Sequence, residues 1–108
     1  MNLLKTIAFA LYPRPWGLAA LGSRSVVMLP RRIEGAPRIR IGSDVIVQPH
    51  SWLAAYRRWG SDVHDPRIVI GDQARIGGHS MITAIEEVEI GEGCLLSEQV
   101  FISDHVHE

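Results

Sequence analysis

Three stretches of the chain repeat one pattern and decide its fold class: residues 39–53 (IRIGSDVIVQPHSWL), residues 68–82 (IVIGDQARIGGHSMI) and residues 88–102 (VEIGEGCLLSEQVFI). Each stretch opens with an aliphatic residue, a variable residue, isoleucine and glycine, and aliphatic residues then recur at every sixth position. These aliphatic residues form three rows: Ile41, Val47 and Leu53; Ile70, Ile76 and Ile82; Ile90, Leu96 and Ile102. Such a period matches neither the 3.6 residues of an α-helical turn nor the alternation of a long strand.

A repeat of six residues fits a short strand followed by a tight corner. Three such units close one coil of about 18 residues, and coils stack at the strand spacing of about 4.8 Å. The aliphatic residue of each unit then points into the coil. Most units place a small or β-branched residue four positions later, where a tapered corner has little room: Val45, Ser51, Ala74, Ser80, Cys94, Val100 and Val106. The glycine after the first aliphatic residue of each stretch is expected to allow unusual backbone angles there.

The repeat is interrupted at Arg57 and at Glu86, where the small corner residue is missing. Successive stretches start 29 and 20 residues apart, so both spacings exceed one coil of about 18 residues. The larger excess falls on residues 56–67 (YRRWGSDVHDPR), whose glycine, aspartate and proline content predicts a protruding loop. The smaller excess falls at residues 86–87.

The composition is that of one soluble globular domain. The chain has 108 residues, of which 46% are apolar and 21% charged, and its formal net charge is −1. A balanced charge argues against nucleic-acid binding. The single cysteine excludes a disulfide framework and fits a reducing compartment. No apolar run approaches the roughly 18–20 residues that cross a bilayer.

The charge is divided unevenly along the chain. Residues 1–40 contain seven basic residues and one acidic residue, whereas residues 41–108 contain four basic and eleven acidic residues. A basic segment of this kind leaves peripheral contact with an anionic membrane surface open for residues 1–40. The alternative is that the segment packs on the repeat as a cap with solvated arginines.

The N-terminal segment has its own expected structure. Apolar residues at a spacing of three to four predict a short helix over Met1–Tyr12, which Pro13 ends. A turn-rich loop over residues 13–25 and a first strand over residues 26–29 are expected to follow. We therefore divide the chain into an N-terminal helix and loop cap, residues 1–32, and a repeat domain, residues 33–108.

The repeat resembles that of the left-handed parallel β-helix acyltransferases, the hexapeptide-repeat superfamily, and in particular its surface-polysaccharide O-acetyltransferase branch. The resemblance covers residues 33–108 and includes residues 100–107 (VFISDHVH), which are similar to the family's strand followed by SDH-x-H. It implies an all-β, left-handed β-helix of about three coils that forms a homotrimer. It also implies acetyl-CoA as acyl donor, no metal, and transfer to a sugar hydroxyl of a cell-surface glycan or its precursor. The implied location is the cytoplasm or the inner face of the cell membrane.

The resemblance assigns the role of general base to His105, with Asp104 and His107 as supporting candidates. A sugar hydroxyl must lose its proton as it attacks a thioester, and a neutral imidazole, with a pKa of about 6.5, suits that task at neutral pH. Trp59 and His64, from the predicted loop, are candidates for contact with the acceptor.

Two other kinds of residue have structural interpretations. His50 and His79 occupy the same phase of the repeat, three residues after an aliphatic position, and are expected to stack at one corner. Cys94 occupies a small-residue corner, where we expect it to pack rather than to act as a nucleophile.

The resemblance is incomplete in two places. Residues 84–87 (AIEE) stand where some family members carry an asparagine that faces the histidine. Family members also continue for several coils past the position of Glu108, so we expect the chain to be the N-terminal portion of such an enzyme.

Two alternative functions stay open. The γ-type carbonic anhydrases share the implied fold and bind zinc through three histidines, but His105 and His107 lie only two residues apart and would chelate from one face of a strand. A truncated, non-catalytic β-helix fragment is the second alternative, because the open edge of a last coil invites assembly.

Overall fold

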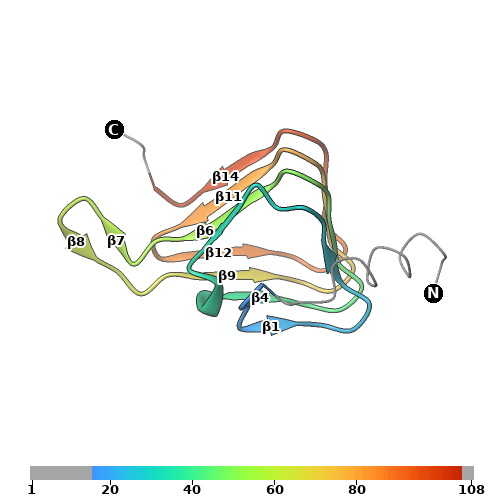
Figure 1. Ribbon diagram of the computed structural model, residues 1–108, viewed down its shortest axis with the longest axis horizontal. Helices are drawn as coiled ribbons and strands as arrows, with labels where there is room; N and C mark the ends of the chain where they lie inside the picture. The colour runs from blue at the N-terminus through green and yellow to red at the C-terminus, as the bar shows by residue number, and fades with distance from the viewer. Residues whose placement is uncertain (1–15, 106–108) are drawn as a thin grey trace.

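A computed structural model of the protein describes residues 16–105, and short β-strands dominate it (Figure 1). Twelve of the strands form three four-stranded sheets in which every pair is parallel. The first sheet contains β1 (Ala20–Leu21), β4 (Ile39–Ile41), β9 (Arg67–Ile70) and β12 (Glu87–Ile90). The second contains β2 (Val26–Val27), β5 (Ile46–Val47), β10 (Arg75–Ile76) and β13 (Leu95–Leu96). The third contains β3 (Arg32–Glu34), β6 (Trp52–Ala55), β11 (Met81–Ala84) and β14 (Phe101–Ser103).

The strand register follows the six-residue rows of the sequence. In the first sheet Ile41 pairs with Ile70, and Ile70 pairs with Ile90. The other two sheets repeat this alignment with Val47, Ile76 and Leu96, and with Leu53, Ile82 and Ile102. The expected all-β class is therefore confirmed, with stacked parallel sheets of the kind found in parallel β-helices.

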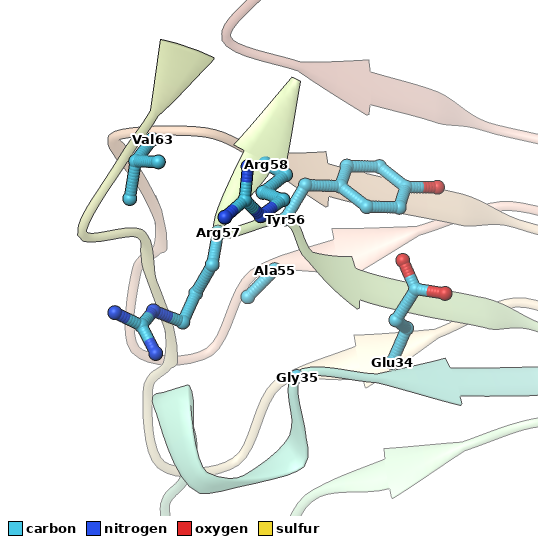
Figure 2. Close-up of a pocket in the computed structure, with 7 residues that line it drawn as sticks. All are labelled: Glu34, Gly35, Ala55, Tyr56, Arg57, Arg58 and Val63. Carbon is cyan, nitrogen blue, oxygen red and sulfur yellow. The ribbon is translucent and has the colours of Figure 1, made fainter. Parts of the chain in front are cut away.

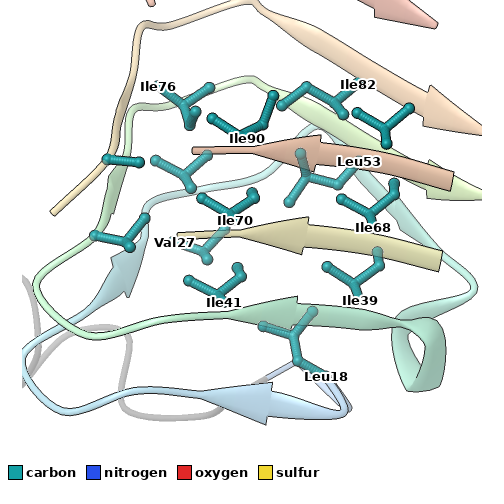
Figure 3. Packing of buried hydrophobic residues seen from close by; sticks show 14 of the residues in the cluster. Leu18, Val27, Ile39, Ile41, Leu53, Ile68, Ile70, Ile76, Ile82 and Ile90 are labelled. Carbon is teal, nitrogen blue, oxygen red and sulfur yellow. The ribbon is translucent and has the colours of Figure 1, made fainter. Parts of the chain in front are cut away.

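The aliphatic rows fill the space between the three sheets. Figure 3 shows Ile41, Ile70 and Ile90 stacked one above another, with Ile39 and Ile68 forming a second column beside them. All five side chains are buried. Complete burial of an isoleucine stabilises the fold by about 1.5–3 kcal/mol relative to exposure, so each of these side chains makes a substantial contribution to stability.

The corners confirm one expectation and correct another. The small residues Val45, Ser51, Ala74 and Ser80 are buried at the corners, as predicted. The glycines that follow the aliphatic residues do not have positive φ angles; these occur two positions later, at Asp44 (60°), Gln73 (63°) and Gly93 (70°). Glycine is required at position 42 because a Cβ there would lie 2.2 Å from Asp72 Oδ1 on the next strand level.

The parallel pairing begins earlier than the sequence analysis expects. The predicted loop over residues 13–25 contains β1, in which Leu21 pairs with Ile41. The predicted first strand is confirmed as β2, where Val27 pairs with Val47, and in β3 Ile33 pairs with Leu53. The predicted helix over Met1–Tyr12 lies outside the described residues.

The predicted protruding loop is confirmed and contains a hairpin. Strands β7 (Arg58–Trp59) and β8 (Asp62–Val63) pair antiparallel across Gly60 and Ser61, and Figure 1 shows them projecting from the end of the sheets. A short 3₁₀ helix, η1 (Ala36–Arg38), lies near the same end. Within residues 16–105, no helix has the length and apolar character needed to span a membrane.

Candidate functional site

His105 lies two residues after the end of β14 and contacts the β7–β8 hairpin at Trp59. The centroid of its imidazole is 4.4 Å from the Trp59 indole, with the rings inclined at 69°, and 6.1 Å from the Tyr56 ring. Tyr56 and Trp59 also contact each other, at 5.3 Å. Only 4% of the His105 side chain is exposed. The structure thus brings together two of the predicted site residues, His105 and Trp59, and adds Tyr56.

Asp104 binds the corner between β11 and β12 through three backbone hydrogen bonds. Its Oδ1 accepts from the N–H of Ile85 at 2.9 Å, and its Oδ2 accepts from the N–H groups of Glu86 and Glu87, both at 2.8 Å. This corner is one of the two places where the sequence repeat is interrupted. The carboxylate therefore supplies hydrogen-bond acceptors for three backbone N–H groups at this irregular corner.

The same carboxylate contacts the imidazole. Asp104 Oδ1 lies 2.9 Å from Nδ1 of His105, and Ser103 Oγ lies 3.1 Å from the same nitrogen. Burial acts to raise the pKa of Asp104, but the hydrogen bonds from His105 and the three backbone N–H groups together hold that pKa below its ordinary value. Asp104 is consequently anionic at neutral pH.

An anionic acceptor at Nδ1 favours the tautomer in which Nδ1 carries the proton. The other ring nitrogen, Nε2, then has the lone pair that a general base needs. Asp104 would also stabilise the imidazolium formed when Nε2 takes a proton. In chemical terms the pair is an oriented acid–base group, and Asp104 is its positioning residue.

A cleft of about 420 Å³ lies on the other side of the hairpin (Figure 2). Seven residues line it: Glu34, Gly35, Ala55, Tyr56, Arg57, Arg58 and Val63. Tyr56 belongs both to this cleft and to the aromatic cluster around His105. Tyr56 therefore connects the cleft to the surroundings of His105.

Other predicted residues have different placements. His64 is half-buried at the base of the hairpin, where its backbone N–H donates to the Arg57 carbonyl at 2.6 Å. His50 and His79 stack as expected, with ring centroids 5.1 Å apart. His107 lies outside the described residues. Among residues 16–105, no group of three or more His, Cys, Asp or Glu side chains is placed to hold a metal ion.

Sequence reasoning missed three residues of this region: Tyr56, Arg57 and Arg58. The signal was present, because Arg57 is the position at which the repeat first loses its small corner residue. The second interruption, at Glu86, marks the corner that Asp104 binds. Both interruptions of the repeat thus adjoin the candidate site.

Comparison of the chain with protein-family models, with curated proteins and with solved structures finds no match.

Proposed function

We propose that the protein is an acetyl-CoA-dependent O-acetyltransferase that acts on a sugar hydroxyl of a cell-surface glycan or its precursor. The observation that carries the proposal is the 2.9 Å contact between Asp104 Oδ1 and His105 Nδ1, which orients the imidazole as a base. The resemblance of the repeat and of the SDH-x-H segment supplies the reaction class. The stacked parallel sheets are compatible with that class.

In the proposed reaction, His105 Nε2 accepts the proton of the sugar hydroxyl as its oxygen attacks the thioester carbonyl carbon. Asp104 stabilises the resulting imidazolium through Nδ1. Acetyl-CoA supplies the acetyl group, and the carbon–sulfur bond breaks as the ester forms. The imidazolium then returns its proton to the departing thiolate, so the base is regenerated.

The proposal extends to fold detail and assembly. We propose a left-handed β-helix with about three coils over residues 33–108, with β1 and β2 before it and β3 at its start. We also propose a homotrimer that works in the cytoplasm or at the inner face of the cell membrane. Cross-linking and sedimentation test the trimer independently of activity.

Replacement of His105 tests the reaction. In the full-length enzyme, transfer of labelled acetyl from acetyl-CoA to sugar acceptors is measured for the wild type, for His105→Ala and for His50→Asn. General-base catalysis contributes about 10²–10⁴-fold, so His105→Ala should lose at least 100-fold of turnover with acetyl-CoA binding retained. His50→Asn is the matched control, because asparagine tolerates the positive φ of 67° at this exposed corner. A loss below about tenfold for His105→Ala would refute the assignment.

A further inference from the structure

The cleft beside the candidate site carries two arginines that have no carboxylate partner among the residues that the structure describes. Arg57 and Arg58 are both exposed, and within residues 16–105 neither forms an ion pair. Figure 2 shows the two side chains on the hairpin side of the cleft, with Glu34 and Gly35 on the opposite side. Two cationic groups at one opening attract anions.

The one acidic residue that lines the cleft forms an ion pair with an arginine outside it. Glu34 Oε1 lies 2.6 Å from the guanidinium of Arg32, which is outside the cleft lining. The charge of Arg57 and Arg58 is therefore not balanced from across the cleft.

A neighbouring cleft shows the opposite arrangement. It has a volume of about 390 Å³ and lies around η1 and the β8–β9 connection. Three arginines and three carboxylates line it: Arg38 pairs with Asp65 and Arg67 with Glu87, and the remaining two, Arg40 and Glu86, carry opposite charges. The charged side chains that line this second cleft therefore balance in number, whereas those that line the first cleft, Glu34, Arg57 and Arg58, leave one positive charge in excess.

The hairpin gives the first cleft a fixed relation to His105. Directly opposed residues of an antiparallel pair point to the same face, so Arg58 and Val63 share one face, and Trp59 and Asp62 share the other. Arg58 and Val63 line the cleft, whereas Trp59 contacts His105. The hairpin therefore presents one face to the cleft and the other to the imidazole, and Tyr56 belongs to both surroundings.

We propose that this cleft binds a negatively charged group, carboxylate or phosphate, on the sugar acceptor. The inference rests on the proposed function, because it takes a sugar as the acceptor. The planar guanidinium matches both anions with paired hydrogen bonds, and the volume lies within the range of roughly 300–1,000 Å³ typical of small-molecule sites. Anchoring the anion here keeps it on the far side of Tyr56 from His105.

Binding of three sugars that share one ring tests the proposal without requiring acetyl transfer. Glucose, glucuronate and glucose 6-phosphate are titrated into isotopically labelled protein, and shifts of the Gly35 and Ala55 amide signals report occupancy of the cleft. At least one anionic sugar should bind about tenfold or more tightly than glucose, the factor expected for hydrogen bonds to a charged group. Whichever of glucuronate and glucose 6-phosphate binds more tightly shows whether the cleft prefers a carboxylate or a phosphate group. Equal affinities for all three sugars, or no binding by any, would overturn the proposal.

Variants test whether anion binding depends on the two arginines of the cleft or on positive charge elsewhere on the surface. The double change Arg57→Gln and Arg58→Gln should remove the preference for the anionic sugar, and both positions are exposed, so the fold should be retained. Arg40→Gln is the matched control, because Arg40 is exposed on β4 and lies outside this cleft. Wild-type affinity in the double variant, or an equal loss in Arg40→Gln, would contradict the assignment.

Failure of this inference differs from failure of the proposed function. Selective anion binding that depends on Arg57 and Arg58, without any acetyl transfer by the full-length enzyme, would leave the cleft assigned and refute the transferase. Acetyl transfer that depends on His105 but treats glucose and the anionic sugars alike would leave the transferase and refute the anion site.

Discussion

The indole of Trp59 meets the imidazole of His105 edge to face, with ring centroids 4.4 Å apart. Trp59 belongs to the hairpin that interrupts the repeat, and His105 follows the last strand of the third sheet. The contact therefore joins an excursion from the sheets to the residue that we propose as general base. It also covers part of the His105 side chain, of which only 4% is exposed.

Removal of the indole should expose the imidazole. We expect Trp59→Ala to raise the rate at which diethyl pyrocarbonate modifies His105 severalfold, because 4% exposure of the side chain now limits attack. Mass spectrometry of the modified peptide measures the rate, with His79 as an exposed internal reference. Val63→Ala, on the opposite face of the hairpin, should leave the rate unchanged; an equal rise in both variants would show that the hairpin as a whole, and not Trp59, shields His105.

Loss of the Asp104 carboxylate should destabilise the fold. Asp104→Asn keeps the size of the side chain, but one acceptor oxygen is replaced by an amide that faces backbone donors at Glu86 and Glu87. Unsatisfied donors of this kind cost about 1–3 kcal/mol. Urea unfolding at neutral pH should therefore show a free energy of unfolding lower by that amount. Asp62→Asn, on the exposed hairpin, is the control and should change the free energy by less than about 0.5 kcal/mol.

The Asp104 contribution should depend on pH in a defined direction. Its pKa in the folded protein is lowered below the ordinary value of 3.8, so the unfolded state binds more protons as the pH falls through that value. The stabilisation is complete above about pH 5 and is lost as the pH falls through the folded pKa. Urea unfolding across this range should show the wild type losing its advantage over Asp104→Asn on acidification. An advantage that stays constant would mean that the carboxylate contributes through shape and not through charge.

The sequence predicts the sheets well because one physical pattern dictates them. A buried aliphatic residue at every sixth position leaves a single way to align Ile41 with Ile70 and Ile90, and the register confirms it. The same spacing connects Leu21, Val27 and Ile33, but nearby prolines and arginines obscure it. The sequence therefore predicts one strand, residues 26–29, and no other strand before residue 33.

The contacts of the candidate site are harder to predict from the sequence. The Asp104 contact depends on the direction of three backbone N–H groups at a corner, which residue identities do not encode locally. The position of Trp59 depends on how the hairpin folds back over the third sheet. Sequence indicates where the repeat is interrupted, at Arg57 and Glu86, but not what those interruptions contact.

Two glycines have nearly equal positive φ angles but different surroundings. Comparing them separates the cost of a steric clash from the cost of backbone strain. Gly35 has φ of 70° and Gly60 has φ of 63°. A Cβ at Gly35 would lie 2.1 Å from the Ala55 carbonyl oxygen, whereas a Cβ at Gly60 would meet nothing within 4 Å. Alanine at either position carries the left-handed penalty of about 1–2 kcal/mol, and only Gly35→Ala adds a clash with β6.

We therefore expect Gly35→Ala to be less stable than Gly60→Ala by at least about 1 kcal/mol, the scale of an overpacked site. Urea unfolding of the two variants measures the difference directly, because the shared strain cancels. Since Gly35 and Ala55 both line the cleft, the displaced backbone should also weaken binding of the anionic sugar in Gly35→Ala and not in Gly60→Ala. Equal stability of the two variants would mean that β3 and β6 approach each other less closely at Gly35 than the structure indicates.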